Sequence, residues 1–94
     1  MSCYKLLFLK NAKKEWDKLD NSIKIQLHKK LKERLLNPKV PSAKLSGYDN
    51  IYKIKLRSSG FRLVYEVKDD KVVVLVLKIG KRDNVYELLE QFLK

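Results

Sequence analysis

Four cations stand in the stretch YKIKLRSSGFRLVYEV, and their spacing brings them together. Side chains alternate across a β-strand, so Lys53, Lys55 and Arg57 share one face, and the apolar residues between them share the other. Ser58-Ser59-Gly60 indicates a turn, and the strand that follows it alternates in the same way. Burying both apolar sets together fixes the register and predicts that Arg62 lies beside Lys53 and Lys55.

This grouping of cations favours an anion site. Like charges on neighbouring strands repel, which destabilises the hairpin unless an anion completes the site. A merely solvated face would carry interleaved acids, and Glu66 is the only acid on the two strands. We therefore expect the face to bind an anion, with a solvated outer face as the alternative.

The same cations suit RNA cleavage through the 2′-hydroxyl. That reaction needs a base for the hydroxyl proton, stabilisation of the charge on phosphorus and a proton for the 5′-oxygen. A lysine among other cations could be the base, since like charges favour its neutral form. Arg62 and Arg82 could hold the developing charge. The single histidine, His28, excludes a two-histidine mechanism. A binding module would display the same cations, so the residues alone leave catalysis and binding open.

Further residues could extend the basic site if the end of the last strand adjoins the hairpin. The segment GKRDNVYE places Lys81 and Arg82 at the end of a strand and Tyr86 about one helical turn later. Phosphate-binding cations beside an aromatic ring that stacks on bases are typical of single-stranded RNA recognition. A place in the core is the alternative for Tyr86. Lys44, in the loop before the hairpin, is either a phosphate contact or a solvated residue.

Composition restricts the partners. The 94 residues are 45% hydrophobic, which predicts one compact domain over residues 1–94. With 22 basic and 11 acidic residues the net charge is +11, so nucleic acid is favoured over an anionic membrane. The single cysteine, Cys3, excludes an internal disulfide and a thiolate zinc cluster. We expect a cytoplasmic protein without metal, cofactor or membrane span, since the apolar N-terminal run is too short to cross a bilayer.

Periodicity predicts the elements that position these residues. Residues 23, 27, 31 and 35 form an apolar stripe on a helix within residues 22–37, which Asn37-Pro38 ends. A helix from Asn11 precedes it, and Asp83 can cap a final helix. We expect strands at residues 3–9, 52–57, 61–67 and 71–79, the last of them buried, central and ended by Gly80. The predicted class is α+β: one compact β-α-α-β-β-β-α domain with a mostly antiparallel four-stranded sheet, an N-terminal α-hairpin on one face and a short C-terminal helix.

The segment KLSGYDNIYKIKLRSSGFRLVYEVKDDKVVVLVLKIGKRDNVY closely resembles the RelE family of toxins. The likeness extends over essentially the whole chain and includes AKKEWDKLD and the helix that ends in NPK. It implies the toxin of a type II toxin-antitoxin pair, a metal-independent endoribonuclease without a cofactor that cuts mRNA in the ribosomal A site and inhibits translation. The implied partners are a RelB-like antitoxin, the ribosome with its rRNA, and mRNA.

The resemblance also implies site residues. Lys53 and Lys55 match the family's two hairpin lysines, Arg62 its phosphate-stabilising arginine, Arg82 the arginine after the last strand, and Tyr86 the tyrosine that stacks on a base. We expect Lys55 to act as general base, Lys53 and Arg62 to stabilise the transition state, and Arg82 to assist or to protonate the leaving oxygen.

Binding to RNA or the ribosome is expected of Lys44, Arg57 and Lys81. The alternatives are a non-catalytic toxin of the same superfamily that blocks another target such as gyrase, and a decayed toxin that acts only in a repressor complex with its antitoxin.

Overall fold

The computed structural model describes residues 3–81, and within them the elements follow the predicted order. The helix expected from Asp83 lies outside these residues. The elements are β1 (Lys5–Phe8), α1 (Lys10–Asp17), α2 (Asn21–Leu36), the 3-10 turn η1 (Pro41–Ala43), β2 (Ile51–Lys55), β3 (Phe61–Lys68), the 3-10 turn η2 (Asp69–Lys71) and β4 (Val73–Lys81).

The four strands form one sheet in the order β1-β4-β3-β2. β1 is parallel to β4, and the other two pairings are antiparallel, so the mostly antiparallel sheet is confirmed. β4 is central, as predicted, but it continues through Gly80 to Lys81. The ladder goes on there because Gly80 pairs with Arg62 and Lys81 pairs with Phe61.

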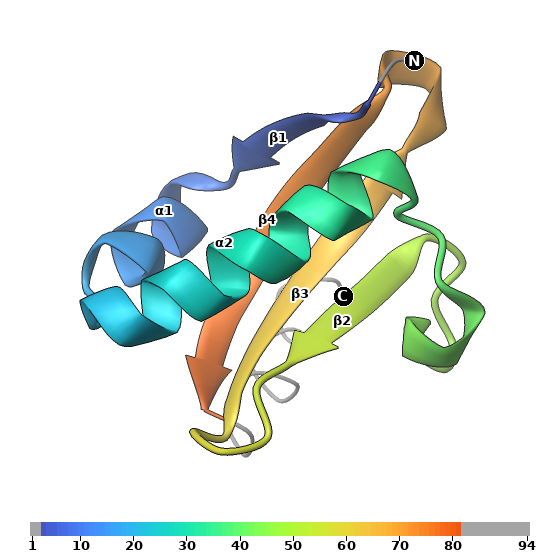
Figure 1. The fold of residues 1–94 in the computed structure, drawn as a ribbon. Coiled ribbons are helices and arrows are strands. Elements are labelled where there is room, and N and C mark those ends of the chain that lie inside the picture. The colour runs from blue at the N-terminus through green and yellow to red at the C-terminus, as the bar shows by residue number, and fades with distance from the viewer. Residues whose placement is uncertain (1–2, 82–94) are drawn as a thin grey trace.

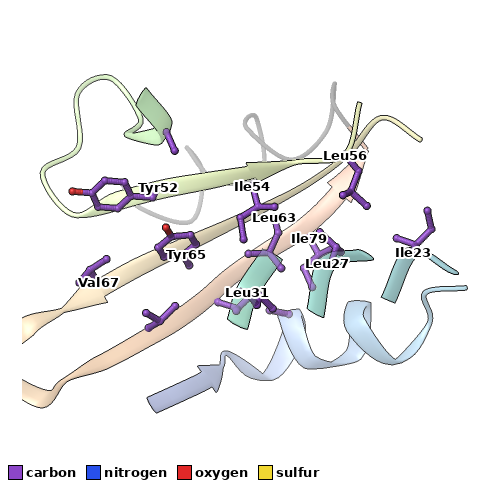
Figure 2. Packing of buried hydrophobic residues seen from close by; sticks show 14 residues of the cluster. Ile23, Leu27, Leu31, Tyr52, Ile54, Leu56, Leu63, Tyr65, Val67 and Ile79 are labelled. Atoms are coloured by element: carbon purple, nitrogen blue, oxygen red, sulfur yellow. The ribbon is translucent and has the colours of Figure 1, made fainter. Parts of the chain in front are cut away.

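The apolar stripe of α2 packs on one face of this sheet, which the helix crosses obliquely (Figure 1). Leu27 and Leu31 are 0% exposed. Figure 2 shows them directed at the strands, with Leu63 and Ile79 close by. Leu35 packs against the same cluster from a partly buried position. The stripe is therefore confirmed as the contact between helix and sheet.

The hairpin register follows the prediction from alternation. Ile54 pairs with Leu63 and Tyr52 with Tyr65, and all four side chains lie in the core beneath α2. Gly60 closes the turn with φ of 78°, a backbone conformation that suits glycine because it has no Cβ. The cations between the apolar residues consequently lie on the other face of the hairpin.

That other face is not simply a solvated surface. It carries a second apolar cluster built on Ile51, Val64 and Leu77, of which Val64 is 0% exposed. Leu77 has no partner in the register because β3 pairing passes from Lys78 directly to Val76, which is a β-bulge. The hairpin cations therefore share this face with an apolar cluster and lie toward the hairpin turn.

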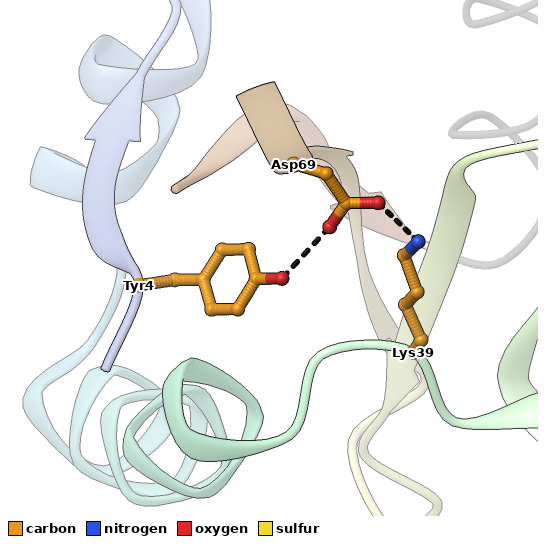
Figure 3. A network of polar contacts seen from close by, with 3 residues as sticks. All are labelled: Tyr4, Lys39 and Asp69. Carbon is orange, nitrogen blue, oxygen red and sulfur yellow. Dashed lines mark hydrogen bonds and ion pairs between the residues drawn. The ribbon is translucent and has the colours of Figure 1, made fainter. Parts of the chain in front are cut away.

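A polar network joins the start of β1, the loop after α2 and the turn between β3 and β4 (Figure 3). The Tyr4 hydroxyl donates to Asp69 Oδ1 over 2.7 Å, and Lys39 forms an ion pair with Asp69 Oδ2. Hydrogen bonds from Lys39 and Tyr4 hold the pKa of Asp69 below its ordinary value. Three separate segments are thus held together at one end of the sheet. Within residues 3–81, none of the helices is long and apolar enough to cross a membrane.

Candidate functional site

The hairpin brings its predicted cations into one row. Lys55 lies directly opposite Arg62 in the β2–β3 register, and Gly80 lies on the other side of Arg62. Paired residues share a face, so the Arg62 side chain has a lysine on one flank and no side chain on the other. Lys53 pairs with Val64 and stands diagonally from Arg62 on the same face. Among the ion pairs within the described residues, none includes Lys53 or Arg62.

Arg62 lies close to the backbone of its own strand. Its Nη1 atom donates to the Phe61 carbonyl over 3.3 Å, and the residue is partly buried. A guanidinium held in this way loses little conformational freedom when it meets a phosphate oxygen. Lys55 is more exposed than Arg62. The row therefore combines a partly buried guanidinium with a more exposed amine.

The row opens at the free edge of β2 into a basic pocket of about 220 Å³. Three predicted site residues line it together with side chains from α2 and η1, and none of the lining residues between positions 3 and 81 is an acid. The lining residues are Lys30, Arg34, Ser42, Ala43, Lys53, Lys55 and Arg57. The structure thus brings Lys53, Lys55 and Arg57 together and adds Lys30 and Arg34.

Arg34 connects α2 to the edge of β2. Its Nη1 atom donates to the Lys53 carbonyl over 3.0 Å and to the Tyr65 hydroxyl over 2.9 Å. The Tyr65 hydroxyl donates in turn to the Pro38 carbonyl over 2.7 Å. Burial raises the pKa of Tyr65, and the bond from Arg34 opposes that rise. The backbone of Lys53 is therefore fixed by a charged side chain on the helix above it.

Lys30 and Arg34 were missed as site residues in the sequence. They are four residues apart on a helix, so they lie on the same flank, one turn apart. Both stand next to Leu31, which marks the buried stripe. The spacing was a usable signal, but the sequence does not say which flank of α2 meets β2.

The remaining predicted cations take different places. Lys44 forms an isolated antiparallel bridge with Tyr52 at the start of the β2 edge, directly after a residue that lines the pocket. Lys81 pairs with Phe61 and therefore lies on the helix-facing side of the sheet, opposite to Arg62. Its Nζ atom donates to the Ser59 carbonyl over 3.1 Å and stands 4.7 Å from the centre of the Phe61 ring. Lys81 is thus not part of the row.

Arg82 and Tyr86 lie outside the described residues. Between residues 3 and 81, no group of three or more histidine, cysteine, aspartate or glutamate side chains is placed to hold a metal ion.

The opposite side of the sheet has a neutralised edge. β1 pairs with β4 only as far as Val76, so the edge of β4 is free beyond that point. Glu15 on α1 covers it: one carboxylate oxygen accepts from the Ile79 backbone N–H over 3.3 Å, and the other forms an ion pair with Lys78 over 3.0 Å. The edges of β2 and of the end of β4 are therefore each met by one charged helical side chain, Arg34 at β2 and Glu15 at β4.

Residues 6–86 match the family described as the ParE toxin of the type II toxin-antitoxin system parDE. The chain is 54% identical to the mRNA interferase toxin RelE of Escherichia coli strain K12 over 81 residues, which are 86% of this chain and 85% of that protein. The structure of the isolated E. coli RelE toxin is similar, with 48% identity, a TM-score of 0.82 and coverage of 97% of this chain and 99% of that one.

The toxin chain in the E. coli RelBE toxin-antitoxin complex is also similar, with 54% identity, a TM-score of 0.81 and coverage of 83% of this chain and 95% of that one. The match to the family and to these toxins extends over the hairpin, α2 and the central strand. This chain belongs to the RelE branch of the ParE toxin family of type II toxin-antitoxin systems.

Proposed function

We infer that this protein is the toxin of a type II toxin-antitoxin pair and acts as an mRNA interferase, an endoribonuclease that inhibits translation. The observation that carries the inference is the 54% identity to an mRNA interferase toxin, together with the row of Lys53, Lys55 and Arg62 on the hairpin. We propose that residues 1–94 form one toxin domain, which works in the cytoplasm, where translating ribosomes present mRNA in the A site.

The proposed reaction needs no metal. The Lys55 amine takes the proton of the 2′-hydroxyl, the 2′-oxygen forms a bond to phosphorus, and the bond from phosphorus to the 5′-oxygen breaks. Lys53 and Arg62 hold the negative charge that develops on the non-bridging oxygens. The 5′-oxygen takes a proton from Arg82. The pairing of Lys55 with Arg62 supports these roles, because it sets a base and a charge-stabilising group on adjacent strands.

Other residues position the RNA in this proposal. Tyr86 stacks on a base next to the cleaved bond, while Lys44, Arg57 and Lys81 contact the backbone of mRNA or ribosomal RNA. The exposure of Lys44, Arg57 and Lys81 supports this role, since phosphate contacts need accessible cations. The ribosome orients the message against a site that is open to solvent on its own.

The partner that silences the toxin is a RelB-like antitoxin. Solved complexes join RelE toxins to RelB antitoxins in E. coli and in two archaea. A chain with net charge +11 offers a broad surface to an acidic segment. Binding of the antitoxin covers cations that RNA would otherwise reach.

Induction of the chain without its antitoxin tests the proposed function. We expect growth arrest and cuts within codons of a reporter mRNA, mapped by the 5′ ends of its fragments. A reporter without a start codon should remain intact, because cleavage needs the translating ribosome. Intact mRNA with a DNA-damage response would contradict the inference and indicate a gyrase-blocking toxin instead. Normal growth with stable expression would indicate a decayed toxin.

The triple variant Lys53→Ala, Lys55→Ala, Arg62→Ala tests the assignment of the site. It should lose the cuts while it still binds the antitoxin and unfolds cooperatively. Lys29→Ala is the matched surface control on α2, and it should cut like the original chain. Cuts that persist in the triple variant would remove these residues from the catalytic site.

A further inference from the structure

Lys53 and Lys55 belong to two surfaces at once. They stand in the row with Arg62, on the hairpin face that we assign to cleavage. They also line the basic pocket at the free edge of β2, whose remaining cations come from α2 and the hairpin turn. A strand of RNA on the row therefore passes the mouth of this pocket.

The α2 side of the pocket is built as a fixed cation site. Arg34 donates from Nη1 to both the Lys53 carbonyl and the Tyr65 hydroxyl. Its Cζ atom lies 5.9 Å from the centre of the Tyr65 ring. A guanidinium has five N–H donors, so three remain for a ligand. Lys30 stands one helical turn before Arg34, and Ser42 adds a hydroxyl from η1.

Within residues 3–81, the side chains that line the pocket include several cations and no carboxylate. The four ion pairs within the described residues include neither Lys30, Arg34, Lys53 nor Arg57. Cations held this close destabilise one another unless an anion enters. The volume of about 220 Å³ is several times the roughly 30 Å³ share of one water, so a phosphate group fits with a few waters.

We propose that this pocket binds a backbone phosphate of an RNA strand, held by Lys30, Arg34 and Ser42. It is a second phosphate subsite beside the one at Lys55 and Arg62. The proposal rests on the proposed function for the identity of the ligand as RNA. An arginine fork with free N–H groups matches two phosphate oxygens, and a lysine and a hydroxyl complete the contacts. Its effect is to fix the register of the strand relative to the cleavage row.

Lys30→Gln tests the subsite, with Lys29→Gln as the matched control. Both residues are exposed on the same helix and both changes remove one positive charge, but only Lys30 lines the pocket. The first probe is a single-stranded RNA decamer that carries a 2′-deoxyribose at the cleavage position, so that it is not cut. Its affinity is measured by fluorescence anisotropy at several salt concentrations. The second probe is vacant small ribosomal subunits, which offer only ribosomal RNA.

We expect Lys30→Gln to weaken binding of the decamer about fivefold to tenfold more than Lys29→Gln. One phosphate contact fewer should also lower the slope of log affinity against log salt by about 0.7. Lys30→Arg should restore both values. A neutral methylphosphonate at one position of the decamer should weaken the original chain and leave Lys30→Gln unchanged. If only the small-subunit probe responds, the bound phosphate belongs to ribosomal RNA, and the subsite stands.

Other outcomes overturn the proposal. These are equal affinities of Lys30→Gln and Lys29→Gln for both probes, no binding of either probe by the original chain at low salt, and, where the decamer does respond to Lys30→Gln, the absence of any single sensitive phosphate in it. Loss of affinity for the antitoxin alone would make the pocket a protein contact and overturn it as well. These results are separate from the proposed function, because mRNA cleavage on ribosomes is measured in its own assay and can fail or succeed independently.

Discussion

Two free strand edges of the sheet, that of β2 and that of β4 beyond Val76, differ in the side chains that meet them. At β4, the carboxylate of Glu15 accepts from the strand and neutralises Lys78. At β2, the guanidinium of Arg34 donates to the strand and adds one more positive charge to a pocket whose described lining residues include no acid. Both arrangements satisfy backbone groups that an edge leaves unpaired.

The difference is one of charge: the β4 edge is neutralised, and the β2 edge, which we propose to be functional, gathers cations. An ion pair at a partly exposed site contributes little to stability, and its charges already neutralise each other. Cations grouped without acids cost stability in the free protein, and they recover it when an anion binds. A helical side chain therefore bonds to the backbone of each strand edge, but only at β2 does it add to a group of cations that we propose to bind RNA.

The largest expected effect is a difference in the rate of mRNA cleavage between a variant at the β2 edge and one at the β4 edge. Lys55→Ala should lower the rate of mRNA cleavage on programmed ribosomes about 100-fold or more, because the proposed general base is lost. Lys78→Ala, the matched change on β4, should leave the rate unchanged. Single-turnover cleavage measures both. Equal losses in the two variants would remove the functional distinction between the edges.

The next effect concerns stability. Arg34→Met should lower the free energy of unfolding by about 1–3 kcal/mol, because the Lys53 carbonyl and the Tyr65 hydroxyl lose a charged donor. Glu15→Gln at the other edge should cost less than about 1 kcal/mol, since an amide oxygen can still accept from Ile79. Urea unfolding measures both changes. A larger loss for Glu15→Gln would reverse our ranking of the two links.

A carboxylate placed in the pocket should make the β2 edge resemble the β4 edge. Ser42→Glu should raise the free energy of unfolding by about 0.2–1 kcal/mol at low salt, because it offsets the repulsion among the lining cations. The gain should shrink as salt rises, and RNA binding should weaken. Ser42→Gln is the uncharged control. A gain that salt leaves unchanged would point to packing rather than charge.

The smallest expected effect concerns the network of Tyr4, Lys39 and Asp69 at the end of the sheet. Its hydrogen bonds from Lys39 and Tyr4 hold the pKa of Asp69 below the ordinary 3.8. The carboxylate therefore contributes stability above that pH, and the contribution is lost as pH falls through the lower folded-state pKa. Asp69→Asn should lack this component, so its melting temperature should fall less steeply in acid. Parallel acid profiles for the two chains would contradict the role of the network.

Alternation was enough to predict the row of cations. A slip of one residue would have buried Lys53, Lys55 or Arg62, so burial of Ile54 and Leu63 left one register. The helical stripe was predictable for the same reason. Both results depend on local periodicity, which a sequence displays directly.

The pocket could not be predicted in this way. Its α2 residues meet β2 only because the strand order is β1-β4-β3-β2, and that order is set by packing between distant segments. The bonds of Arg34 to Lys53 and Tyr65 are equally remote in sequence. Sequence reasoning found the half of the site that lies on one hairpin and missed the half that a second element brings to it.

The bulge at Leu77 interrupts the alternation of side chains along β4, so the residues before and after it follow different alternations. If β4 alternated strictly with Leu77 in the ladder, Lys78 and Gly80 would lie on the same face as Val76, toward the helices. With the bulge, Ile79 faces the core and Gly80 stands beside Arg62. A bulge also adds right-handed twist to its strand, so the last residues of β4 are rotated relative to the first. One inserted residue thus places Gly80 beside Arg62 and rotates the end of β4 next to the row of cations.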